Sequence, residues 1–82
     1  MSDIDDKSHG SEDALCRILK RFIGENVTLH LRSGDTIEGI LIRVKRGIVE
    51  VRELVMVSPF EESQLVITRC RNIESFSVPT TS

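Results

Sequence analysis

The side chains that could carry chemistry in this 82-residue chain are few, and none forms a spacing typical of catalysis. His9 and His30 each stand alone, without a second metal ligand nearby in the sequence. Cys16 and Cys70 form no CxxC pair, and free cysteines of this kind usually behave as small buried hydrophobes. The acidic residues follow no acid–base spacing, and no phosphate loop or nucleophile elbow is present. We therefore expect no enzymatic activity, no catalytic residue, no metal site and no cofactor.

Four cations in two predicted turns are the remaining candidates. Lys45 and Arg46 lie in one turn, and Arg69 and Arg71 lie in the other. Clustered cations of this kind can bind the phosphates of a nucleic acid strand, although ordinary solubilising charge in turns explains them equally well. Residues 1–14 carry a net charge of −4, and the other 68 residues carry +2. The mildly basic part permits nucleic-acid binding without requiring it.

A single helix is predicted over residues 12–23, ahead of the turns. Its apolar side chains recur at i, i+3, i+4 and i+7 and so share one stripe: Leu15, Ile18, Leu19 and Phe22. Gly24 suits the left-handed position that ends a helix. We expect the stripe to pack on the remaining elements, which is favoured over a role at a membrane surface or a partner.

Short strands with tight turns are predicted for the rest of the chain. Alternating apolar residues and turn glycines predict strands at 27–32, 36–44, 48–57, 64–69 and 73–78. Ser33-Gly34-Asp35 forms the first turn, and Pro59 interrupts the ladder because it lacks a backbone donor. Gly39 lies where the apolar phase becomes ambiguous, which indicates a bulge, a sharp bend or a close backbone approach, and we expect the strand to bend there. A strongly bent sheet of such strands closes into a small barrel.

The order and spacing of two motifs resemble those of the Sm-like proteins, the superfamily of the Sm, Lsm and Hfq proteins. The first motif follows the helix and comprises Gly24, Val27, Leu29, Leu31, Gly34, Ile37, Gly39 and Leu41. Residues 66–76 resemble the second motif of the family, with Arg69-Cys70 where the family most often has Arg-Gly. The resemblance covers roughly residues 13–78.

The resemblance implies a mainly β fold in which the helix precedes a five-stranded, strongly bent antiparallel SH3-like (Sm-type) barrel. This domain is expected over residues 12–78, after a disordered acidic tail at 1–11 and before a frayed end at 79–82. It also implies a cyclic homo-oligomer of five to seven subunits, in which strand 64–69 of one copy pairs with strand 73–78 of the next. The expected interface side chains are Leu65, Val66, Ile67, Ile73 and Phe76.

In Sm-like rings, the loops that match the two basic turns border the central hole. The family's RNA-binding members carry Asp-x-aromatic or apolar-x-Asn after the second strand, whereas this chain has Lys-Arg-Gly-Ile-Val at 45–49. The usual base pocket is therefore not supported. We expect a non-enzymatic ring protein whose basic loops bind RNA or single-stranded nucleic acid through phosphates, or alternatively an oligomeric protein scaffold. The absence of a signal sequence or long apolar run, together with two cysteines that form no CxxC pair, favours a reducing, cytoplasmic setting and a protein without a membrane segment.

Overall fold

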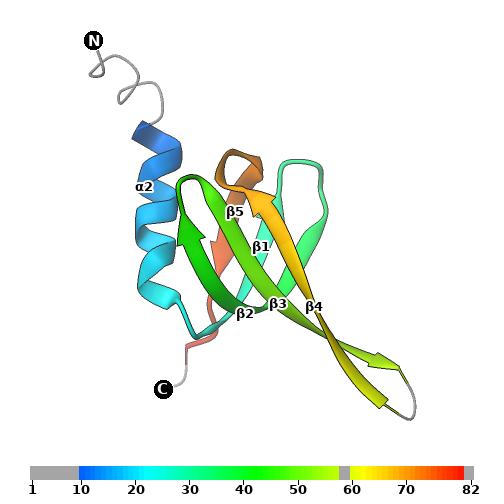
Figure 1. Cartoon of the computed structure of the whole chain (residues 1–82). Helices are drawn as coiled ribbons and strands as arrows, with labels where there is room; N and C mark the ends of the chain where they lie inside the picture. The colour runs from blue at the N-terminus through cyan, green and yellow to red at the C-terminus, as the bar shows by residue number, and fades with distance from the viewer. Residues whose placement is uncertain (1–9, 58–59, 81–82) are drawn as a thin grey trace.

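The computed structural model describes residues 10–57 and 60–80, and its elements there are one α-helix, two short 3-10 helices and five strands (Figure 1). They are α2 (Gly10–Leu19), the 3-10 helix η1 (Lys20–Phe22), β1 (Asn26–Leu31), β2 (Thr36–Lys45), β3 (Ile48–Val57), β4 (Phe60–Arg69), the 3-10 helix η2 (Cys70–Asn72) and β5 (Ile73–Ser77). The helix begins two residues before the predicted start. Residues 10 and 11, predicted to belong to a disordered tail, lie in α2, whereas residues 1–9 lie outside the described part.

The strands form one antiparallel sheet in the order β4-β3-β2-β1-β5. The predicted mainly β class with an N-terminal helix is thereby confirmed. In the described part of the chain, β4 and β5 are the two edges and do not pair with each other. The sheet is therefore not closed into a barrel by hydrogen bonds, which corrects the predicted closure: bending brings strands closer, but only a β4–β5 ladder would remove the edges.

The fourth strand is longer than predicted. It starts at Phe60 and pairs with β3 along its whole length, from Val57 opposite Phe60 to Ile48 opposite Arg69. The predicted interruption up to residue 63 is wrong, because a proline removes only its own backbone donor and leaves the following residues free to pair. Figure 1 shows the resulting β3–β4 hairpin reaching away from the other strands.

The core lies between α2 and one face of the sheet. Leu19 of the helix and Val27, Leu29 and Leu41 of β1 and β2 are fully buried, and Phe22 contacts Phe76 of β5 with 5.9 Å between ring centroids. The helical stripe therefore packs on the sheet, as predicted, although Ile18 is 45% exposed and lies at its edge. This packing stabilises the helix, because an isolated helix of this length would be only marginally stable in water.

The bend in β2 has two visible causes. The register with β3 shifts between Leu41 and Arg43, so that one extra residue bulges out of the ladder. At Gly39, an added Cβ would lie 2.2 Å from the backbone oxygen of Arg52. The prediction of a close backbone approach at this glycine is confirmed.

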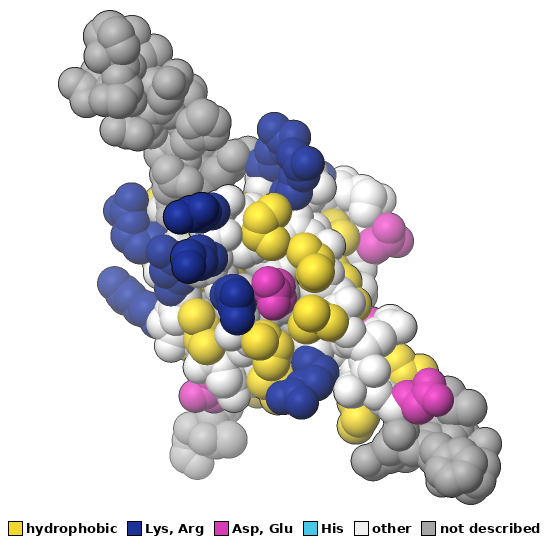
Figure 2. Space-filling view, in the orientation of Figure 1, with side chains coloured by type: hydrophobic (Ala, Val, Ile, Leu, Met, Phe, Trp, Pro, Cys, Tyr) yellow, Lys and Arg dark blue, Asp and Glu magenta, His cyan; other side chains and the backbone are white. Residues whose placement is uncertain are grey.

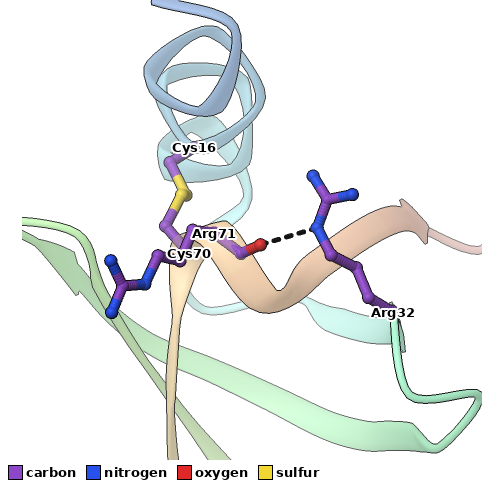
Figure 3. Close-up of a disulfide and its surroundings, with 4 residues drawn as sticks. All are labelled: Cys16, Arg32, Cys70 and Arg71. Carbon is purple, nitrogen blue, oxygen red and sulfur yellow. Dashed lines mark hydrogen bonds between the residues drawn. A yellow bond between two sulfur atoms is a disulfide. The ribbon is translucent and has the colours of Figure 1, made fainter. Parts of the chain in front are cut away.

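The two cysteines are paired, although the sequence favoured buried packing for them and left their redox state open. Cys16 of α2 and Cys70 of η2 form a disulfide with 6.3 Å between their Cα atoms, within the usual range (Figure 3). The two residues are 54 positions apart in the sequence, so local patterns could not reveal the pair. The disulfide ties the helix to the segment between β4 and β5.

Candidate functional site

The two basic turns lie side by side at one end of the sheet. The backbone N–H of Cys70 donates to the carbonyl oxygen of Gly47 over 2.8 Å, which joins η2 to the β2–β3 turn. Ile48 pairs with Lys45 on one side and with Arg69 on the other. Residues directly opposite each other share a face of the sheet, so these two cations flank Ile48 on one face.

Arg46 lies on the side of the same turn that faces α2. It has a positive φ of 53°, followed by Gly47 at 77°, the pattern of a tight hairpin turn with two left-handed residues. Its side chain lines a pocket of about 250 Å³ together with Arg17 and Lys20 of the helix region. Figure 2 shows Lys and Arg side chains gathered over α2 and the adjoining end of the sheet.

Arg71 extends the positive charge to η2. It is exposed, and its carbonyl oxygen accepts a hydrogen bond of 2.7 Å from Nε of Arg32. Figure 3 shows the Arg71 side chain pointing away from Arg32, so that the two guanidinium groups lie on opposite sides of the η2 backbone. The segment after β1 therefore supplies another cation to this end of the molecule.

We call this surface the basic end. It comprises Arg17, Lys20, Arg32, Lys45, Arg46, Arg69 and Arg71. The four cations singled out in the sequence all belong to it, although they face different sides. Sequence reasoning missed Arg17, Lys20 and Arg32. Arg17 and Lys20 are three residues apart, a spacing that places them on one helical face. Only the tertiary packing of α2 brings that face to Arg46.

The predicted interface residues fall into two groups. Leu65 and Ile67 of the edge strand β4 are 54% and 59% exposed. Val66 and Phe76 are partly buried against the core, and Ile73 is 2% exposed within it. Of these five residues, only Leu65 and Ile67 are therefore more than half exposed, whereas the two on β5 are buried or partly buried.

The described residues offer little for metal binding, base stacking or membrane crossing. No group of three or more His, Cys, Asp or Glu side chains there could hold a metal ion. Phe22 and Phe76 pack edge to face on each other and are half-buried, so neither offers an open ring for base stacking. Within residues 10–57 and 60–80, no helix has the length and apolar character needed to cross a membrane.

Comparisons with known proteins leave the family of this chain open. No family model matches its sequence, and a search of curated proteins finds no matching relative. The basic end and the two open sheet edges are therefore the features from which a function can be argued.

Proposed function

We propose that this chain is a non-enzymatic, Sm-like ring protein that binds RNA or another single strand through its phosphates. The observation that carries the proposal is the basic end, to which four separate chain segments contribute cations. Cations gathered from segments that are distant in sequence make a stronger local field than the net charge suggests. A strand of nucleic acid is a polyanion that such a gathering of cations attracts.

The mode of recognition follows from the side chains available. Arginine and lysine contact phosphate oxygens, which fixes a strand without reading its bases. The acid, stacking side chain and amide of the usual Sm-like base pocket are replaced by residues 45–49. Because Phe22 and Phe76 are occupied with each other, binding is expected to show little base preference.

The ring is supported by the strand order. An open sheet with β4 at one edge and β5 at the other can pair head to tail with identical copies. Such a contact is heterologous and closes into a ring when the rotation between copies fits. The resemblance to Sm-like proteins sets the expected size at five to seven subunits, with β4 of each copy paired with β5 of the next.

The test measures binding of short labelled RNAs of different base composition by fluorescence anisotropy over a range of salt concentrations. Replacing Lys45 and Arg46 together by Ala should weaken all sequences alike and reduce the log–log salt slope by about 0.7 for each phosphate that these side chains neutralise. Replacing Arg52, an exposed cation outside the basic end, by Ala is the control. Sequence-selective or salt-insensitive binding would contradict phosphate recognition.

A protein scaffold is the second candidate, and a separate observation favours it. Leu54, Leu65 and Ile67 are each more than half exposed, and the pairing of β3 with β4 places them on one face. Exposed apolar side chains beside an open strand edge suit a protein partner. An absence of RNA and single-stranded DNA binding at low salt would favour this candidate.

The cytoplasmic location expected from the sequence rested partly on two cysteines that show neither a CxxC spacing nor a secretory signal. The Cys16–Cys70 disulfide removes that support, because disulfides persist mainly in oxidising compartments. Labelling of free thiols in protein isolated under acid quench would give the redox state of the pair in its native setting. A fully labelled pair would restore the argument for a reducing compartment.

A further inference from the structure

The pocket between α2 and the β2–β3 turn has the composition of an anion site. Three cations line it, together with two buried apolar side chains and a glycine: Arg17, Lys20, Arg46, Cys16, Val44 and Gly47. None of the described lining residues is acidic. The positive charges therefore surround a hollow in which, among these residues, no carboxylate neutralises them.

The volume of the pocket admits a small ligand. Pockets for drug-sized molecules measure roughly 300–1,000 Å³, whereas this one measures about 250 Å³. Guanidinium groups bind phosphate oxygens in pairs, and lysine adds a compact positive charge. A phosphate group fits both the size and the charge of the lining.

The backbone at Arg46 provides a second, independent observation. A left-handed conformation disfavours most L-residues, and the first position of such a turn is usually Asn, Asp or Gly. Arg46 adopts φ 53° at this position, so the chain carries a long cation where a short residue would suit the turn better. Local strain that brings a charged side chain to a pocket points to a role in binding.

The two walls of the pocket, the helical segment and the β2–β3 turn, are joined through Cys70 of η2. Cys16 of the helix is bonded to Cys70, whose N–H donates to Gly47 of the turn. The helix that carries Arg17 and Lys20 is thereby fixed relative to the turn that carries Arg46. A site assembled before the ligand arrives loses less free energy in ordering its side chains.

We propose that this pocket binds a phosphate group, either as inorganic phosphate or as the terminal monoester of a larger molecule. The proposal goes beyond the proposed function, because it requires neither a ring nor a bound strand. The contacts come from one copy of the chain. A dianionic terminal phosphate also differs in charge from the singly charged diesters along a strand.

The test follows the backbone ¹H–¹⁵N signals of the full, oxidised chain during titration with inorganic phosphate, with chloride at matched ionic strength as the reference. Saturable shifts are expected at Arg17, Lys20, Arg46 and Gly47. Arg46→Asn should lower phosphate affinity about tenfold and at the same time raise the melting temperature, since Asn suits the turn. Arg17→Gln should lower affinity without raising the melting temperature. Arg52→Gln, outside the pocket, should change neither.

Two further titrations distinguish the source of the phosphate. Tighter binding of a 5′-phosphorylated dinucleotide than of inorganic phosphate assigns the pocket to the end of a strand, and equal binding assigns it to a small phosphate compound. The proposal is overturned by shifts that do not saturate, by an Arg52→Gln variant that loses as much affinity as Arg46→Asn, or by equal binding of phosphorylated and unphosphorylated dinucleotides.

Discussion

Replacing Gly39 by Ala tests the close approach of β2 and β3 that bends the sheet. The added Cβ would lie 2.2 Å from the carbonyl oxygen and 2.9 Å from the carbonyl carbon of Arg52, and 3.0 Å from Cγ1 of Val51. Two of these three atoms belong to the backbone and cannot rotate away. The strands must therefore separate beside the bulge, where Ile40 and Leu41 pair with Arg52 and Val51.

The expected cost is large for a single methyl group. Overpacking typically costs about 1–3 kcal/mol, and weakening one ladder hydrogen bond adds about 1 kcal/mol. Replacing a strand glycine by alanine returns about 0.5–1 kcal/mol of backbone entropy, which leaves a net loss of about 1–3.5 kcal/mol, centred near about 2 kcal/mol. A chain of this length is stable by roughly 4–12 kcal/mol, and a loss of about 2 kcal/mol should lower its melting temperature by about 8–16 °C.

Thermal and urea unfolding under non-reducing conditions, followed by circular dichroism, would measure this loss. The matched control is Gly34→Ala, at φ 99° with no atom outside the adjoining residues within 4 Å of the added Cβ. There, backbone strain of about 1–2 kcal/mol, less the same entropy gain of about 0.5–1 kcal/mol, leaves an expected loss of about 1 kcal/mol. A Gly39→Ala variant that is as stable as the natural chain, or no less stable than Gly34→Ala, would refute the close approach as the reason for glycine.

Three further outcomes are expected. Reducing the Cys16–Cys70 disulfide should lower the free energy of unfolding by about 2–4 kcal/mol, since it closes a loop of 54 residues; equal denaturation midpoints with and without reductant would contradict this. Leu19→Ala should cost about 2–5 kcal/mol because Leu19 is fully buried, whereas Ile18→Ala, at 45% exposure, should cost less than half as much in the same urea titration. Ile67→Lys should reduce the mass measured by light scattering to that of one chain while leaving the circular dichroism spectrum unchanged, because an edge lysine opposes strand pairing; a natural chain that is already monomeric at micromolar concentration would exclude the ring.

The local elements were predictable because their signals lie within a few residues of one another. Val27, Leu29 and Leu31 alternate with polar residues, and the first two are fully buried in β1. Gly34 has the positive φ that its turn required. Alternation and turn chemistry act over two to four residues, so the sequence indicates them directly.

Element ends were less predictable where long-range pairing decides them. Residues 60–63 show no clear alternation, yet they form strand because β3 lies opposite and supplies ladder partners. Propensity sets only a weak preference there, and tertiary context overrides it. For the same reason the predicted barrel closure could not be deduced from the strands alone, since it depends on whether β4 and β5 meet.

The sequence by itself determined the mainly β class, the amphipathic helix, the glycine at the close approach and the two basic turns, all of which depend on residue type and short spacing. Only the tertiary structure decided that Cys16 meets Cys70 and that Arg17 and Lys20 face Arg46 across a pocket. Each of these contacts joins residues more than 25 positions apart. They form because burial of Leu19 and its neighbours sets α2 on the sheet, and burial depends on the whole core rather than on any local pattern.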